Sequence, residues 1–158
     1  MKHSIKTGVS FGLTSGIITT LGLIVGLHSS THSEVVVIGG ILTIAIADSF
    51  SDALGIHVSE ESEGKHTAKE IWASTIFTFL SKFIFALSFI GIFLIFKLSL
   101  AIAFSIVWGL VLLSIFSFYI SRHEKIRAIF SVIEHLTIAL VVIFLTHWIG
   151  HWIGTHFC

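Results

Sequence analysis

Two aspartates, Asp48 and Asp52, lie four residues apart in the stretch "ADSFSDALGIHVSEESEGKH" (residues 47–66), which begins inside an almost uncharged apolar segment. On an α-helix such a spacing puts both carboxylates on one face. Paired carboxylate oxygens suit a hard or borderline divalent cation, and neighbouring carboxylates can also carry protons because they ionise one after the other. The pair therefore indicates exchange of a cation against protons. The alternative is a protonated pair that is hydrogen-bonded in a helix-bundle core.

The two aspartates head a polar stripe on the same helix face, since about 100° separates successive residues of a helix. We expect this stripe to line a hydrated path, with Ser51 as a further ligand to the metal. The stripe continues through Gly55, Ser59, Ser62, Glu63 and His66. Glu60, Glu63 and His66 are candidates to gather metal ions at the mouth of the path, and an ordinary solvated charge run is the alternative.

Lys82 lies near the middle of another apolar segment, where a charged side chain is costly. It is a candidate charge partner for the two aspartates, which would make the pair partly structural. The alternative is that its flexible stem carries the ammonium group to the membrane surface, but the middle of a span is far for that.

A histidine pair, His147 and His151, lies near the end of the chain in "THWIGHWIGTHF". Because i and i+4 share a helix face, this pair is a candidate second metal site. The alternative is an interfacial belt formed together with Trp148 and Trp152.

These residues lie in a chain that is 54% hydrophobic, 11% charged and free of proline. A soluble domain has about 25% charged residues, so this composition favours a polytopic membrane protein. A helical span needs about 20 apolar residues. The sequence predicts an all-α integral membrane protein that forms a single domain over residues 1–158, with five transmembrane helices at about 7–27, 35–59, 71–96, 98–120 and 129–153.

Positive charges outside the spans alternate between the two sides of the membrane. The tail and the connections on one side hold Lys2, Lys6, Lys65, Lys69, Arg122, Lys125 and Arg127, whereas the other side holds Lys97. The positive-inside rule thus predicts a cytoplasmic N-terminus and a C-terminus on the opposite side. The formal net charge is zero with neutral histidines, so nucleic acid is not expected as a partner. The one cysteine, Cys158, excludes an internal disulfide.

Glycines recur at intervals of four in the first span, at Gly8, Gly12 and Gly16 and again at Gly22 and Gly26. Small residues at this spacing let helices approach closely in lipid. They indicate one of two roles. The first is helix packing within one chain, and the second is a dimer seam or a flexible gating helix.

Two stretches resemble the vacuolar iron transporter family and its nodulin-like relatives. "SGIITTLGLIVGL" (residues 15–27) is similar to the family's first helix, which reads Asp-Gly-Leu-Val-Thr-Thr. "ADSFSDALGIHVSEESE" (residues 47–63) is similar to its second helix, which reads Ala-x-x-x-Ser-Met-x-x-Gly-x-Tyr and then Ser and Glu. The last span, with "THWIGHWIG", resembles the family's last helix more loosely. The connection at residues 60–70 is too short for the acidic metal-binding domain of larger members.

The resemblance implies a homodimer whose path lies between subunits and is lined by the first two helices. It also implies export of Fe²⁺ or Mn²⁺ from the cytoplasm in exchange for protons. Three family positions differ here: Ser15 stands where members carry aspartate, Asp52 stands where they carry methionine, and Ile44 stands where some members carry glutamate. Since oxygen ligands favour harder ions, this change tilts the expected selectivity toward Mn²⁺.

We therefore expect a divalent-metal transporter, not an enzyme, with Fe²⁺ or Mn²⁺ (alternatively Zn²⁺ or Co²⁺) as transported ion and no permanently bound cofactor. Asp48 and Asp52 would bind the ion, while Ser15, Thr19, Gly55 and Ser59 line its path. Its partners would be the lipid bilayer, a second copy of the chain, metal ions and protons. The membrane would be the plasma membrane of a prokaryote or a vacuolar-type membrane of a eukaryote. The alternatives are a non-transporting membrane assembly protein, or a membrane haem or metal enzyme that uses the intramembrane histidines.

Overall fold

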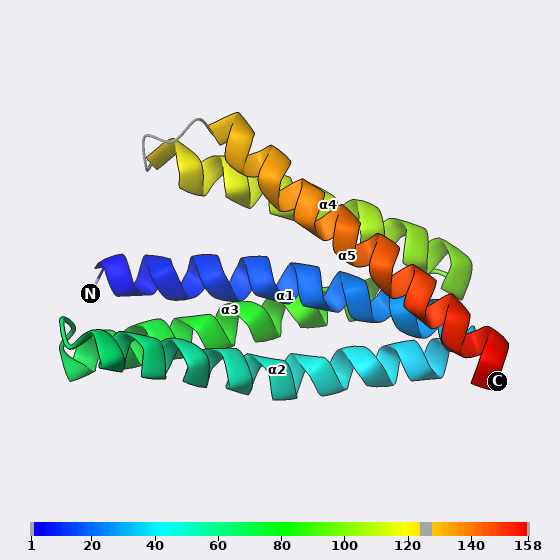
Figure 1. Cartoon of the computed structure of the whole chain (residues 1–158), viewed down its shortest axis with the longest axis horizontal. Coiled ribbons are helices and arrows are strands. Elements are labelled where there is room, and N and C mark those ends of the chain that lie inside the picture. The colour runs from blue at the N-terminus through cyan, green and yellow to red at the C-terminus, as the bar shows by residue number, and fades with distance from the viewer. Residues whose placement is uncertain (1, 124–127, 158) are drawn as a thin grey trace.

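The computed structural model describes residues 2–123 and 128–157, and these residues form helices joined by short turns (Figure 1). The helices are α1 (Lys2–Thr31), α2 (Glu34–Glu63), α3 (Ala68–Ile95), α4 (Leu98–His123) and α5 (Ala128–Phe157). All five are long and apolar enough to cross a membrane, and the described residues contain no strand. The predicted all-α fold with five membrane-spanning helices is thus confirmed. Most helix ends lie beyond the predicted spans, whereas α3 ends at Ile95, just before its predicted end.

Local sequence signals explain where the helices stop. The Ser33 side chain accepts a hydrogen bond from the backbone N–H of Val36, which caps the start of α2. Gly64 ends α2 in the left-handed conformation at φ 63°, which glycine adopts without a steric penalty. The Glu70 side chain then accepts a hydrogen bond of 3.1 Å from the Thr67 backbone N–H at the start of α3. The caps at Gly64 and Thr67 leave a short turn between α2 and α3, which pack against each other.

Helix α1 is the centre of the bundle and packs against all four other helices. More than half of its membrane-spanning stretch, 56%, is buried, compared with 6% for α5. The core on α1 consists of apolar residues at helical spacing with no exposed surface, namely Leu13, Ile17, Leu21 and Ile24. The central position of α1 explains why it approaches its neighbours so closely.

The glycine rows of α1 make these close approaches possible. A Cβ at Gly8 would lie 2.3 Å from the carbonyl oxygen of Ser74, and a Cβ at Gly12 would lie 2.4 Å from that of Thr78. Farther along α1, a Cβ at Gly22 would lie 2.8 Å from Val142 of α5. The glycines therefore serve helix packing within the chain, with the first row facing α3 and the second facing α5, so neither row is free to form a dimer seam.

The two ends of the described chain lie at opposite ends of the bundle, as Figure 1 shows. Helices α4 and α5 form a hairpin that crosses α1 toward the C-terminal end and diverges from α1–α3 toward the N-terminal end (Figure 1). Two of the residues used to predict the orientation, Lys125 and Arg127, lie outside the described residues. Cys158, which was considered for disulfides, also lies outside them. Which end faces the cytoplasm stays a prediction.

Candidate cation site

The acidic pair of α2 meets Lys82 of α3 halfway along the bundle. The ammonium Nζ of Lys82 lies 2.5 Å from Oδ2 of Asp48 and also contacts Oδ2 of Asp52. It donates a hydrogen bond to the Asp52 oxygen, whereas its contact with Asp48 is an ion pair without hydrogen-bond alignment. One cation is therefore shared by two carboxylates.

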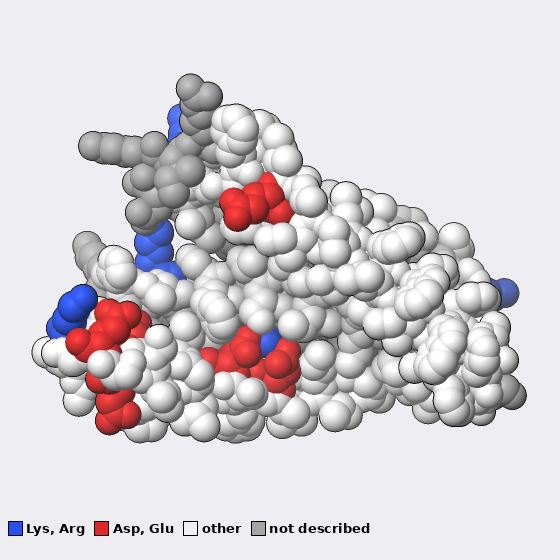
Figure 2. All heavy atoms as spheres, in the orientation of Figure 1, with Lys and Arg blue, Asp and Glu red and all other residues white. Residues whose placement is uncertain are grey.

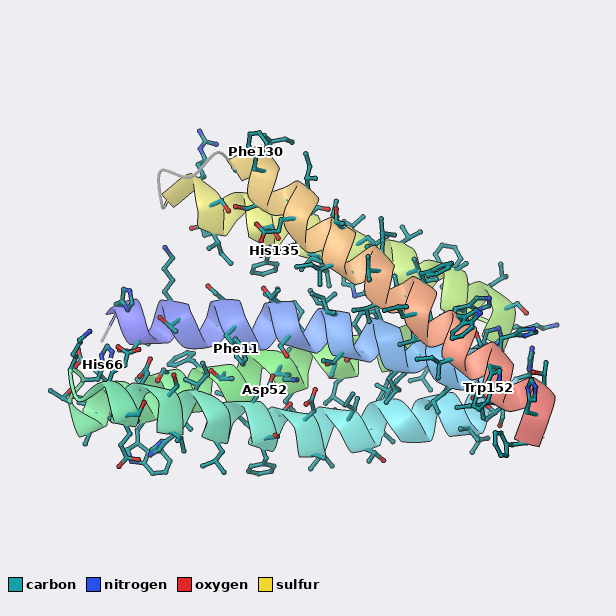
Figure 3. All side chains as sticks on the ribbon, viewed as in Figure 1. Phe11, Asp52, His66, Phe130, His135 and Trp152 are labelled. Carbon is teal, nitrogen blue, oxygen red and sulfur yellow. The ribbon has the colours of Figure 1, made fainter. Side chains whose placement is uncertain are left out.

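Ser15 of α1 completes this group of polar side chains. Its hydroxyl donates a hydrogen bond of 2.6 Å to Asp52 Oδ2 and accepts one of 2.9 Å from Lys82 Nζ. Gly16 allows the approach, because its missing Cβ would lie 3.1 Å from the Cγ atom of Lys82. Three helices thus converge on one point, and each contributes a residue from near its own middle. Figure 3 shows Asp52 on α2 pointing toward α1 and α3.

The charges of this cluster do not cancel. Two carboxylates and one ammonium leave a formal charge of −1 in the middle of a membrane-spanning bundle. The side chain of Lys82 is only 2% exposed, whereas those of Asp48 and Asp52 are 26% and 20% exposed. The lysine is thus enclosed by protein, and the carboxylates face partly outward. Figure 2 shows this acidic group at the middle of one face, with a basic side chain beside it.

A groove between α1 and α2 leads to Asp48. Its cavity has a volume of about 580 Å³ and is lined by Thr19, Leu23, Gly40, Thr43, Ile44, Ala47, Asp48 and Ser51. Thr19, which was predicted to line the path, and Ser51, which was predicted as a ligand, both line this groove. Gly55 and Ser59 lie exposed farther along α2, and neither lines it. The Thr19 hydroxyl donates to the Ser15 carbonyl oxygen at 2.9 Å, so its own donor is already used.

The predicted mouth residues separate into two environments. Glu63 is exposed, and its Oε2 lies 3.7 Å from Nε2 of His66. Glu60 is buried at 7% exposure and accepts a hydrogen bond of 2.6 Å from Ser74 of α3. The expectation that Glu60 stands at an open mouth is therefore wrong. It continues the buried row of α2, seven residues after Ala53, and this periodicity is the signal that could have placed it.

The histidines of α5 make separate polar contacts. At the C-terminal end, Nδ1 of His147 lies 2.7 Å from the Ser29 hydroxyl of α1, and its ring stacks on His151 at 6.4 Å between centroids. Toward the N-terminal end, Nδ1 of His135 lies 2.7 Å from the Ser117 hydroxyl of α4. These serines were not anticipated, and their hydrogen bonds tie α5 to its neighbours.

Within the described residues, no group of three or more histidine, cysteine, aspartate or glutamate side chains could hold a metal ion. One chain thus offers a cation two carboxylates and nearby hydroxyls at the acidic pair, and two histidines at the C-terminal end. Divalent cations such as Mg²⁺ and Mn²⁺ prefer about six oxygen ligands. A cation at the acidic pair therefore needs water or a second chain to complete its ligands.

The model of the VIT family matches residues 7–73 of this chain. No curated protein and no solved structure matches the chain. The matched residues comprise most of α1, all of α2 and the first turns of α3, and they contribute Ser15, Asp48 and Asp52, whereas Lys82 lies beyond them. This match, together with helices that are long and apolar enough to span a bilayer, supports an integral membrane protein that is similar to the VIT family.

Proposed function

We propose that this protein carries a divalent transition-metal ion, Mn²⁺ or Fe²⁺, across the membrane in exchange for protons. The observation that carries the proposal is the acidic pair itself, which lies halfway along the bundle, is partly exposed and borders a groove through Asp48. Ionisable groups inside a membrane are costly and usually mark an ion or proton path. The similarity to the VIT family indicates metal-ion transport as the class of function.

We propose further that two copies of the chain form the complete site. The groove beside Asp48 lies on a surface of α1 and α2 that no other described helix covers. A second copy facing this groove would bring four aspartates together and would supply ligands that one chain lacks. It would also cover the apolar residues Leu23 and Ile44 that line the groove.

The ligand types at the acidic pair support harder divalent ions as the transported species. The charged residues at the N-terminal end support entry of the ion from that end. All side-chain donors at the acidic pair are oxygens, and the sole methionine of the sequence is Met1, so no thioether is present to favour softer ions. Exposed Glu63 and half-buried His66 at the N-terminal end of the bundle would concentrate cations there. With a cytoplasmic N-terminus, the direction of transport is out of the cytoplasm.

The decisive test is metal-dependent proton flux in liposomes that contain the purified protein and a pH-sensitive dye. Asp52→Asn keeps the shape of the side chain and removes its charge, and it is expected to abolish flux driven by Mn²⁺ or Fe²⁺. Glu61→Gln is the matched control, because Glu61 lies exposed on the same helix. Unchanged flux in Asp52→Asn would refute the assignment of the site.

The ion pair also favours one competing function, a non-transporting membrane protein in which Lys82 neutralises the aspartates for stability. The triple variant Asp48→Asn, Asp52→Asn and Lys82→Met separates the two functions. It removes all three charges of the cluster, so a purely structural ion pair predicts recovered folding and the normal activity of the assembly. Transport predicts a folded protein without metal-dependent flux.

A further inference from the structure

We infer that Lys82 is a tethered cation that occupies the acidic pair until a divalent cation displaces it, and that it thereby excludes monovalent cations. This inference rests on the proposed function and assigns a specificity-determining role to a residue outside the family match. Its basis is the position of Nζ, which contacts one oxygen of each aspartate, where a bound cation would also lie.

Charge balance explains why a divalent ion is needed. With Lys82 in place the cluster carries −1, and adding a divalent cation beside the ammonium would bring it to +1. Two like charges in contact in a poorly solvated site repel strongly. Metal binding and the lysine contact are therefore mutually exclusive.

A monovalent ion gains nothing by replacing the ammonium, because the charge of the cluster stays the same. The lysine also has the advantage of a ligand held next to its site by a covalent tether, so its effective concentration is high. A divalent ion has twice the charge and can overcome this advantage. The lysine thus sets a charge threshold for occupancy of the pair.

The structure offers the displaced ammonium another acceptor. Thr78 lies one turn before Lys82 on α3, it is fully buried, and its Oγ1 has no hydrogen-bond partner in the described part of the chain. Helical side chains lean toward the N-terminus, so the residue four positions earlier is within reach of a lysine. Thr20, Ser49 and Ser105 also have buried hydroxyls without a partner among the described residues, but Thr78 is the one that lies a single turn from Lys82 on the same helix.

The test measures cation affinity by calorimetry on the purified full chain, with Mn²⁺ as probe and K⁺ as competitor. Lys82→Met is expected to bind Mn²⁺ at least about tenfold more tightly than the unaltered protein. It should also lose Mn²⁺ to K⁺ at concentrations that do not affect the unaltered protein. Lys97→Met, at the exposed turn between α3 and α4, is the matched control and should change neither quantity. A merely structural lysine predicts equal or weaker Mn²⁺ binding in Lys82→Met, and that result would overturn the inference.

Two further variants decide the matter if Lys82→Met does not fold. Lys82→Arg keeps a permanent charge and adds a bidentate fork for carboxylates, so Mn²⁺ binding is expected to weaken about tenfold. Thr78→Val removes the alternative acceptor and should weaken Mn²⁺ binding without lowering the melting temperature of the ion-free protein. If the unaltered protein binds no divalent cation, the proposed function itself fails. If it binds Mn²⁺ and both variants bind equally well, only the role of Lys82 is refuted.

Discussion

Replacing Gly12 by alanine tests the contact that holds α1 against α3. The new Cβ would lie 2.4 Å from the Thr78 carbonyl oxygen and 3.1 Å from its Cα atom. Both atoms belong to the backbone of α3, so no side chain can rotate away. Since comfortable contacts between heavy atoms lie at about 3.5 Å or more, the helices must separate locally by about 1 Å.

The expected cost follows from this separation. Overpacking by one methyl group typically costs about 1–3 kcal/mol, and the better helix propensity of alanine returns about 0.5–1 kcal/mol. We therefore expect a net loss of about 1–2 kcal/mol, which corresponds to a melting temperature lower by about 2–8 °C for a chain of this size. The same separation moves Ser15 away from Lys82, so Mn²⁺ affinity should change as well.

Thermal unfolding of the protein in detergent, followed by circular dichroism, measures the effect. Gly91→Ala is the matched control, because it lies inside α3 and a Cβ there meets no described atom within 4 Å. Alanine at this position should leave the melting temperature unchanged or raise it slightly. The reasoning is wrong if Gly12→Ala and Gly91→Ala melt alike. It is also wrong if Gly12→Ala changes only the dimer fraction in light scattering, since the glycine row would then lie between copies.

Two other predictions concern the polar clusters. Ser15→Asp restores the carboxylate that the family resemblance places on the first helix, and it adds a third negative charge near Lys82 Nζ, which lies 2.9 Å from the present hydroxyl. We expect calorimetry to show Mn²⁺ binding about tenfold more tightly, and weaker binding would contradict an acidic cation site. His147→Ala removes the contact with Ser29 that ties α5 to α1, so the melting temperature should fall by a few degrees, about 1 kcal/mol, with and without Zn²⁺. Stabilisation by Zn²⁺ that disappears in this variant would instead support the metal site at His147 and His151.

Periodicity and hydropathy are local properties, and they were sufficient for the fold class. Long apolar runs predicted five spans, because a bilayer requires about 20 apolar residues per helix, and the five helices confirm this. The i, i+4 spacing placed Asp48 and Asp52 on one face before any packing was known. The two motifs in the first two spans were enough to indicate the family that the match over residues 7–73 supports.

Packing between helices decided what each polar face meets. The sequence singled out Lys82 as a charge partner, but only the approach of α3 to α1 at Gly16 sets its ammonium against both carboxylates and Ser15. The sequence grouped Glu60 with an open mouth, whereas the rotation of α2 about its axis turns it toward Ser74.

The glycine rows of α1 also show which features local sequence predicts and which depend on helix packing. Their spacing predicted a close helix contact, and the fold alone selected α3 and α5 as the partners. A helix's own residues determine where it begins, where it ends and which side chains share a face. Its rotation and its neighbours depend on contacts between residues far apart in sequence, which no local pattern contains.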